Sequence, residues 1–250
     1  MENSQLSILN FQLKKMKHTE KELQSLKGEV NEMWKLVLSQ FEKSKQALLD
    51  GNGELAREIV SREKRVDAFE LKIESDCENY IALYSPVAID LRLVLSLIKI
   101  SLTLERIGDF AEGIARHVID CNKPNPQLME ELQIEKMFDI LLGMLSDCFV
   151  ALETENTKIS GKVLAKDDEI DTLYHNSVDI LTNYITENKT LDSEKDETAS
   201  ALHSPLFIEK VNCGLKLLLI IRKLERTGDH CINMMEEIVF YVDAKVLKHS

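Results

Sequence analysis

The chain has 250 residues, of which 44% are hydrophobic, 30% charged and 6% aromatic. It therefore holds enough apolar material for a core and too much for a disordered chain. Nine glycines and four prolines are too few turn-forming residues for an all-β or α/β fold. The 31 basic and 43 acidic residues give a net charge of −12. This charge disfavours a nucleic-acid partner and favours a protein or a cation.

The cysteines and the apolar runs bear on where the protein works. Its five cysteines are odd in number and none is spaced as CxxC, which is typical of reduced thiols in the cytosol. The N-terminus lacks the apolar core of a signal peptide. The two most apolar runs, 91–104 and 215–224, are shorter than the roughly 20 residues that span a bilayer. We therefore expect a soluble protein with no direct membrane insertion.

The sequence is an internal repeat. LERIGD at 104–109 recurs as LERTGD at 224–229, an offset of 120, whereas Val66-Asp67 matches Ile170-Asp171 at an offset of 104. One insertion of roughly 16 residues reconciles the two offsets. The polar, acidic segment 186–200 is the obvious place for it.

Taken in chain order, the apolar period predicts helices over about 5–49, 54–83 and 86–120 in the first half. Gly51-Asn52-Gly53 is the first turn, and Ser85-Pro86 is expected to cap and open the third helix. The segment 121–127, rich in Asn and Pro, is expected to be an exposed, extended connector.

The second half is predicted to form helices over about 128–153, 156–186 and 204–245, the last opened by Ser204-Pro205. Short connections favour antiparallel neighbours. We therefore predict an all-α fold of two tandem three-helix bundles, 1–123 and 124–250, related by a pseudo-twofold internal repeat and packed side by side.

Each half carries two pairs of acidic residues spaced four apart, one pair on its second helix and one on its third. Residues four apart share a helix face, and like charges there destabilise a helix by about 0.2–0.5 kcal/mol per pair. The pairs are Glu63 and Asp67, Glu105 and Asp109, Asp167 and Asp171, and Glu225 and Asp229. Arg106 and Arg226 follow the glutamates directly and point away from the pairs.

Carboxylates are the ligands that hard and borderline cations prefer, and they can bridge several ions. The acidic pairs therefore predict a polynuclear metal platform, although acids on solvated helix faces remain the alternative. Gly108 and Gly228 are unusual inside helices. They suit either close helix packing or room for an ion beside the acids.

Familiar catalytic patterns are missing from the sequence. A di-iron oxidase needs Glu-x-x-His pairs, and no histidine here follows a glutamate at that spacing. The sequence has no HExxH motif and no phosphate-binding P-loop. Three readings remain: a regulator acting through protein contacts, a carboxylate-rich polynuclear metal enzyme, and a purely structural helical adaptor.

With LERIGD, LERTGD, the helix sequence at 90–116 and EEIVFYV at 236–242, the chain resembles the PhoU family of bacterial phosphate-transport accessory and regulatory proteins. The resemblance covers essentially the whole chain. It implies a fold of two three-helix bundles whose acidic pairs bind multinuclear clusters of iron or of another metal such as Mn, Mg, Zn or Ni. Glu63, Asp67, Glu105 and Asp109 would form one site, and Asp167, Asp171, Glu225 and Asp229 the other.

The resemblance also implies a role that is regulatory and not enzymatic. Family members restrain uptake through the ATPase subunit of the phosphate-specific ABC transporter, and help a sensor histidine kinase repress the phosphate-starvation regulon. The implied location is the cytoplasm, peripheral to the inner membrane through protein partners. One departure stands out: Asn233 fits the family pattern, but its counterpart is Gly113, which allows the two metal sites to differ in affinity.

The N-terminal extension has no counterpart in the second half. Leu6, Leu9, Leu13 and Met16 recur there at three- and four-residue spacing, which gives a narrow apolar stripe. The stripe either packs on its own bundle or associates with a second copy or a partner. Because dimers are common in the family that the chain resembles, we expect a homodimer.

Overall fold

The computed structural model describes residues 2–120, 125–186 and 205–245, and every regular element in these ranges is helical. The first half contributes three helices and the second half four helices and a 3-10 turn. In chain order they are α1 (Glu2–Asp50), α2 (Gly53–Tyr84), α3 (Ala88–Asp120), α4 (Pro126–Glu131), α5 (Ile134–Thr154), η1 (Thr157–Ile159), α6 (Ser160–Thr186) and α7 (Pro205–Asp243).

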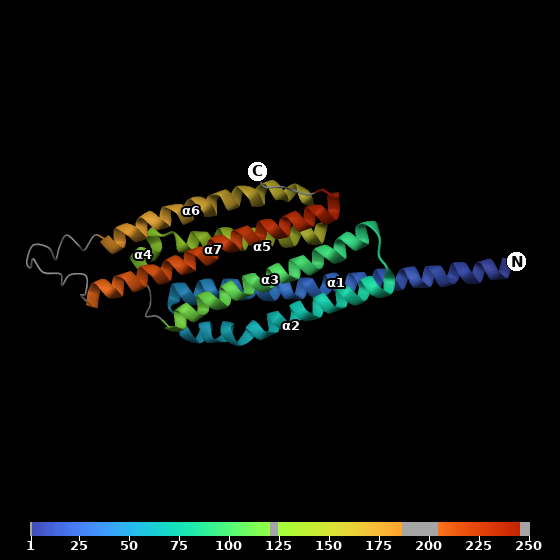
Figure 1. Ribbon diagram of the computed structural model, residues 1–250, viewed down its shortest axis with the longest axis horizontal. Helices are drawn as coiled ribbons and strands as arrows, with labels where there is room; N and C mark the ends of the chain where they lie inside the picture. The colour runs from blue at the N-terminus through green and yellow to red at the C-terminus, as the bar shows by residue number, and fades with distance from the viewer. Residues whose placement is uncertain (1, 121–124, 187–204, 246–250) are drawn as a thin grey trace, which may run out of the picture.

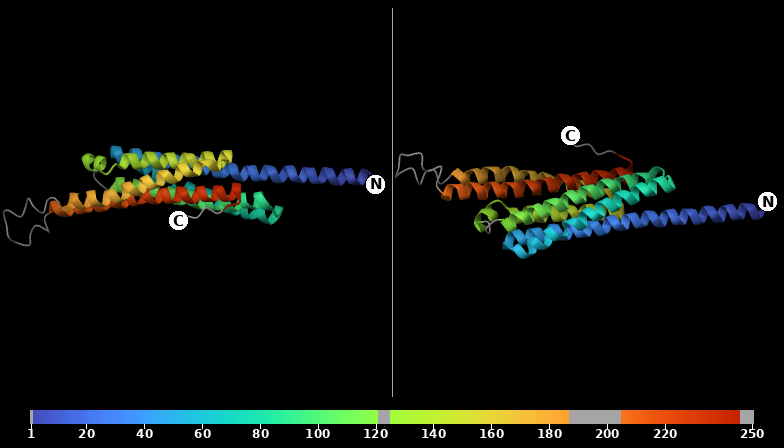
Figure 2. Two further views of the ribbon diagram at one scale, coloured as in Figure 1. Left: turned by 90° about the horizontal axis from the view of Figure 1, so that it is seen from above. Right: turned by 60° about the horizontal axis from the view of Figure 1, so that its bottom comes forward.

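The long helices run side by side along the long axis of the molecule (Figure 1). α1, α2 and α3 pack together as one bundle, and α5, α6 and α7 as the other. α3 packs on α7 and α1 on α5, so the two bundles share one interface (Figure 2). The prediction of two three-helix bundles is confirmed. None of the described helices combines the length and the apolarity that crossing a membrane needs.

The same turn joins the first two long helices of each half. The Asn52 side chain accepts hydrogen bonds from the amides of Glu54 and Leu55, both at 3.1 Å. Asn156, its partner at the offset of 104, accepts from the Lys158 amide at 3.1 Å. Both are N-caps, which satisfy amides that a helix start leaves unpaired. The repeat deduced from the sequence is therefore present in three dimensions.

The start of α3 differs from the prediction. Ser85 does not cap α3: it ends α2 in the left-handed conformation, φ 47°, and its amide donates to Ile81 O. α3 begins only at Ala88, so the predicted opening at Ser85-Pro86 is wrong. The residue before a proline is held out of the right-handed helical region, and this ends α2 there. In the second half Pro205 does open α7, as predicted, and Ser204 lies outside the described residues.

The link between the halves also differs from the prediction. Asn125 caps α4 through the Gln127 amide at 3.0 Å, and Pro126 stands in its first turn, so residues 125–127 are not an extended connector. The helix predicted over 128–153 is broken at Gln133, φ 51°. Residues 121–124, which hold the predicted domain boundary, and nearly all of the 186–200 insertion lie outside the described residues. The boundary at 123/124 stays a prediction.

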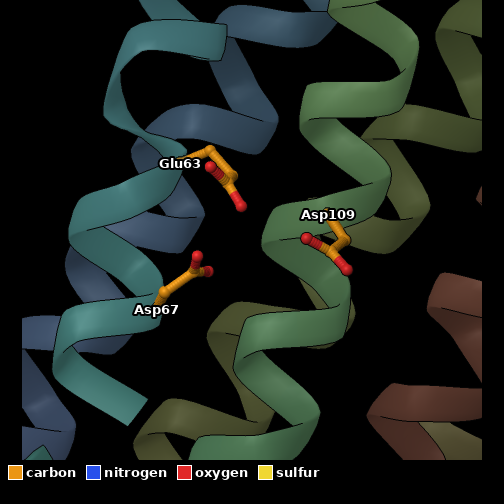
Figure 3. A group of neighbouring side chains, drawn as sticks. All are labelled: Glu63, Asp67 and Asp109. Atoms are coloured by element: carbon orange, nitrogen blue, oxygen red, sulfur yellow. The ribbon is translucent and has the colours of Figure 1, made fainter. Parts of the chain in front are cut away.

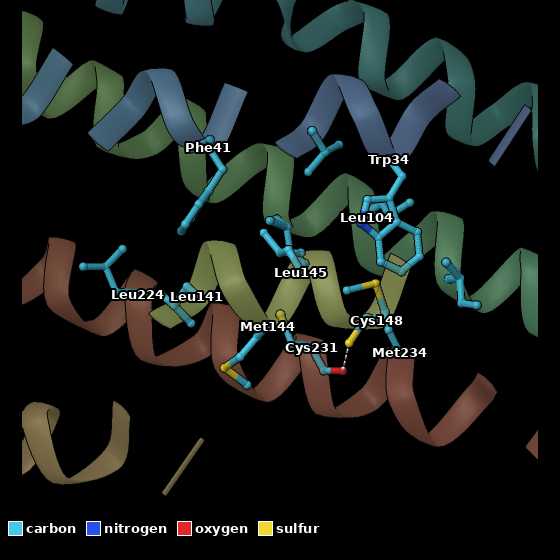
Figure 4. Close-up of a cluster of buried hydrophobic side chains, with 14 of the residues drawn as sticks. Trp34, Phe41, Leu104, Leu141, Met144, Leu145, Cys148, Leu224, Cys231 and Met234 are labelled. Carbon is cyan, nitrogen blue, oxygen red and sulfur yellow. Dashed lines mark hydrogen bonds between the residues drawn. The ribbon is translucent and has the colours of Figure 1, made fainter. Parts of the chain in front are cut away.

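Large buried side chains fill the interface where the two bundles meet (Figure 4). The Phe41 and Phe138 rings lie 5.2 Å apart between centroids, and Trp34 lies 5.8 Å from Phe149. Fully burying such a side chain stabilises the fold by about 1.5–3 kcal/mol. The Cys148 thiol is buried beside them and donates to Cys231 O at 3.4 Å. Burial raises the pKa of Cys148, so this thiol is protonated and packs as an apolar group.

Candidate metal centre

Three carboxylates from two helices converge on one point. Glu63 and Asp67 on α2 face Asp109 on α3, and one oxygen from each lies within 4.8 Å of the other two (Figure 3). The spacing of four residues puts Glu63 and Asp67 on one face of α2, one turn apart. We call Glu63, Asp67 and Asp109 the carboxylate triad. It joins three of the four acids that were predicted for the first metal site.

Gly108 brings the two helices close enough for the carboxylate triad to form. A Cβ at Gly108 would lie 3.2 Å from Cγ1 of Val66, which is the buried residue between the two acids of α2. Without that Cβ, Val66 packs directly on the backbone of α3. In this half the glycine therefore serves close helix packing.

The charges of the triad repel one another. Burial raises the pKa of Glu63, and the charge of Asp67 raises it further. Burial also raises the pKa of Asp109, followed by the charge of Asp67, while Lys223 lowers it. Two arginines on these helices pair with other acids, Arg62 with Glu58 and Arg116 with Glu112.

No described Lys or Arg forms an ion pair with the triad. A bound cation would relieve this repulsion, and carboxylate oxygens are the donors that hard cations take. The triad therefore fits a metal ion by its chemistry.

The fourth predicted ligand lies beside the triad but is not part of it. Burial raises the pKa of Glu105, and the charges of Asp109 and Asp67 follow in size. Two further acids, Glu70 and Glu112, border the same group: Glu70 raises the pKa of Glu105, and Glu112 raises that of Glu63. Sequence reasoning missed both. Their signal was the spacing of three residues from Asp67 and from Asp109, which continues the acidic face by one turn.

The second set of predicted ligands is more open. Burial raises the pKa of Glu225 on α7, and the charges of Asp229 and then Asp171 raise it too, so the acids of α6 and α7 face each other. However, no three acids of this set have oxygens within 4.8 Å of one another in the described structure. Asp167 lies over Gly228, where a Cβ would be 2.6 Å from its Oδ1. In this half the glycine makes room for a carboxylate.

The described structure is that of a helical-bundle protein with acidic pairs on adjacent helices. The model of the PhoU domain matches residues 30–118 and 134–238, one range in each half. The chain therefore belongs to the PhoU family.

Individual relatives agree with this assignment. A phosphate-specific transport system accessory protein PhoU homolog of Caulobacter vibrioides is 30% identical over 228 residues, 90% of each chain. One of Aquifex aeolicus is 38% identical over 168 residues, 67% of this chain and 76% of the relative. The crystal structure of the phosphate transport system regulatory protein PhoU from Streptococcus pneumoniae has 25% identity and a TM-score of 0.72, covering 92% of this chain and all of that one. PhoU from Pseudomonas aeruginosa has 24% identity and a TM-score of 0.75, and it supports the fold.

Proposed function

We propose that this protein is a metal-binding regulator of phosphate uptake and of phosphate-starvation signalling. It acts from the cytoplasmic side of the membrane, through contacts with the ATPase subunit of the phosphate-specific ABC transporter and with a sensor histidine kinase. It lowers uptake and represses starvation genes when phosphate is ample. The relatives named as accessory proteins of the phosphate-specific transport system match it over 90% of its length, and this observation carries the proposal.

The metal part of the proposal rests on the carboxylate triad. Glu63, Asp67 and Asp109 would hold the ion, with Glu105 beside them, and the metal would be iron or another of the divalent ions Mn, Mg, Zn or Ni. A bound cation would supply the positive charge that lets these acids stay ionised next to each other. It would also tie α2 to α3 at the point where their acids repel. The second site would use Asp167, Asp171, Glu225 and Asp229.

The proposed role is regulatory rather than catalytic. The relatives are named as accessory and regulatory proteins. A polynuclear hydrolase would also need a proton donor or acceptor at the metal. A phosphatase assay of the metal-loaded protein separates the two, because turnover of a phosphate ester would favour the enzyme.

The regulatory role is tested by deleting the gene in its native host. We expect a phosphate-starvation reporter to rise in phosphate-rich medium and to fall again when the wild-type gene is restored. A deletion strain whose reporter stays low in that medium would contradict the proposal.

Complementation with variants then isolates the metal. The double variant Glu63→Gln/Asp67→Asn should fail to restore repression. Glu42→Gln/Asp50→Asn removes the same two charges from exposed positions on α1 and should restore it. Equal repression by the two variants would remove the metal from the regulatory role and leave the family role standing.

The assembly is also a proposal: a homodimer formed through the N-terminal part of α1. This part continues past the ends of α2 and α3 (Figure 1). A bond from Tyr80 Oη to Thr19 O at 3.4 Å holds α1 to α2 near that end. Light scattering at about 50 μM, well above a dissociation constant of about 1 μM, should give a dimer that deletion of residues 1–20 weakens. A monomer of the full chain would exclude it.

A further inference from the structure

A group of basic side chains surrounds one aromatic ring where α3 crosses α7. Lys223 Nζ and Arg226 Cζ each lie 5.5 Å from the centroid of the Phe110 ring. The His230 imidazole stacks on the same ring at 5.5 Å between centroids and 30° between planes. Arg106 stands one turn before Phe110 on α3 and therefore shares its face. We call Arg106, Lys223 and Arg226 the basic cluster.

The basic cluster lies at the centre of the repeat. Arg92 Nε donates to Tyr241 O at 3.2 Å, and Ser96 Oγ donates to Glu237 O at 3.1 Å, so α3 and α7 run antiparallel. Continued along the helices, this register places Arg106 opposite Arg226, its repeat partner at the offset of 120. Two equivalent arginines therefore meet at the pseudo-twofold axis.

Acids lie near the basic cluster without pairing with it: the charge of Lys223 acts to lower the pKa of Asp109, and that of Arg106 acts to lower the pKa of Glu105. Lys99 on the same helix pairs with Glu237 at 2.8 Å. By contrast, none of the three cluster residues forms an ion pair with an acid among the residues that the structure describes. The chain as a whole has a net charge of −12, so three cationic side chains at one place form a local region of positive charge. Arg106 and Arg226 are exposed, so a ligand from solvent can reach them.

His230 adds a buried polar atom beneath the cluster. Its side chain is only 7% exposed, and its Nε2 has no hydrogen-bond partner in the described structure. An imidazole ring carries at least one N–H, which it can donate to an anion.

Gly113 allows Lys223 to take its place in the cluster. A Cβ at Gly113 would lie 2.6 Å from Lys223 Nζ, so the lysine side chain lies directly over the backbone of α3. The equivalent residue in the second half is Asn233, and the repeat partner of Lys223 is Thr103. The third positive charge therefore has no counterpart in the first half: Lys223 belongs to the second half, and its side chain reaches over α3 of the first.

We propose that Arg106, Lys223 and Arg226 bind a phosphate dianion, either free orthophosphate or the phosphoryl group of a small ester. Three positive charges match a doubly charged oxyanion better than a single carboxylate, and guanidinium groups bind tetrahedral oxyanions through paired N–H donors. The inference goes beyond the proposed function, because neither a metal bound by carboxylates nor contacts with a transporter require an anion at the crossing of α3 and α7.

The direct test is isothermal titration of the full chain at about pH 8, where phosphate is a dianion. The protein is first treated with a chelator, because a bound metal could itself take phosphate. Orthophosphate, glycerol phosphate and acetate are titrated at matched ionic strength. We expect saturable binding of at least one phosphate probe, and a loss of affinity of about tenfold or more in Lys223→Gln and in Arg226→Gln.

Two matched pairs of variants separate a site from general electrostatics. Arg57→Gln removes an exposed charge from the first turns of α2 and should leave binding unchanged. Gly113→Ala keeps every charge but displaces the Lys223 amine, so it should weaken binding severalfold. Gly161→Ala, where a Cβ meets nothing within 4 Å, should not. Circular dichroism of each variant checks that the fold is intact.

Each outcome decides the matter. Binding of orthophosphate identifies the free ion as the ligand, and binding of glycerol phosphate alone identifies a phosphoryl group on a larger molecule. The proposal is overturned by the absence of saturable binding with both probes up to about 10 mM, a weak limit for a specific site. It is equally overturned if acetate binds as tightly as phosphate, or if Arg57→Gln weakens binding as much as Arg226→Gln.

Discussion

The two halves place an ion-pair network at the same three positions, with the charge reversed at two of them and kept positive at the third. In the first half Glu58 accepts from Lys43 at 2.7 Å and from Arg62 at 2.8 Å. At the offset of 104 the second half has an acid where Lys43 stands and lysines in place of Glu58 and Arg62. These are Asp147, Lys162 and Lys166, and they form two ion pairs of 2.8 and 2.7 Å.

The reversal shows that the geometry of the repeat does not depend on which partner carries which charge. Exposed pairs of this kind contribute only about 0.2–1 kcal/mol, so the sign of a charge can change while the helices stay in place.

The carboxylate triad behaves differently. Its three acids converge in the first half, whereas the corresponding acids of the second half stay more open, with Asp167 over Gly228. Metal sites, unlike ion pairs, depend on where each oxygen lies.

The largest expected effect comes from the shared core. Trp34 and Phe138 occupy equivalent positions, are buried and pack on the interface between the bundles. Trp34→Ala should lower the free energy of unfolding by about 3–5 kcal/mol, because it leaves a cavity. Trp34→Phe copies the second half and removes a buried indole N–H that has no partner, so it should cost under about 1.5 kcal/mol. Urea unfolding followed by circular dichroism measures both, and equal losses would refute the equivalence.

Metal titration compares the two acidic sites directly. Because the carboxylate triad is preformed, we expect Glu63→Gln/Asp67→Asn to lower the tightest metal affinity by at least about tenfold, some 1.4 kcal/mol. Asp167→Asn/Asp171→Asn should mainly affect a weaker phase. Elemental analysis after dialysis and calorimetric titration with Mn²⁺ and Fe²⁺ give the values. If the second variant loses the tighter phase, the proposed ranking of the sites is reversed.

The two motif glycines should respond to alanine with opposite signs. At Gly228 the close contact of a Cβ is with the flexible end of Asp167 at 2.6 Å, while Ile170 and Leu141 lie at an ordinary 3.7 Å. The metal-free variant should therefore gain up to about 1 kcal/mol of helix propensity. At Gly108 a Cβ meets buried, β-branched Val66 at 3.2 Å, and Gly108→Ala should cost about 1 kcal/mol through overpacking. Unfolding in the presence of chelator measures both. A gain at Gly108 would mean that α2 and α3 are not held closely together.

The caps test the turn that both halves share. Asn52 satisfies two amides and Asn156 one. We expect Asn52→Ala to cost about 1 kcal/mol and Asn156→Ala about half of that. Asn176→Ala, at an exposed position in the middle of α6, is the control for helix propensity. Equal costs at the two caps would show that the second amide adds nothing.

The smallest effect is a pH dependence confined to the metal-free protein. The pKa of Glu63 and that of Asp109 are raised in the folded state, so the folded protein binds more protons than the unfolded chain near these values. This contribution to stability is present below the ordinary pKa of glutamate, 4.5, and is lost as the pH rises through the raised values.

The comparison that isolates this effect uses Glu63→Gln/Asp67→Asn. As the pH rises above 4.5, the ordinary pKa of glutamate, the melting temperature of the wild type should fall relative to that of the variant. Metal-saturated wild type should not show the fall. A constant difference between wild type and variant over this range would mean that the acids are too well solvated to repel.

The start of α3 shows where local sequence patterns stop being decisive. Ser85-Pro86 and Ser204-Pro205 look alike in the sequence, yet Ser85 ends α2 and Pro205 opens α7. A serine before a proline can end one helix or cap the next, and the local pattern does not decide which. The break at Gln133 between α4 and α5 is similar, because nothing in the local sequence marks a residue of positive φ there.

The sequence alone determined the helices, the repeat and the acidic faces. Helical period and N-caps are local properties, set by residues within a few turns of one another, and spacing of four residues puts acids on one face whatever packs against it.

Only the tertiary structure decided which acids converge. The distance between Asp67 and Asp109 depends on how closely α2 approaches α3, which Val66 and Gly108 set across 42 residues of chain. The basic cluster is decided in the same way, since Lys223 reaches Phe110 only because α3 and α7 cross antiparallel with a glycine at 113. A side chain's partners on another helix follow from packing, and no local pattern in the sequence encodes them.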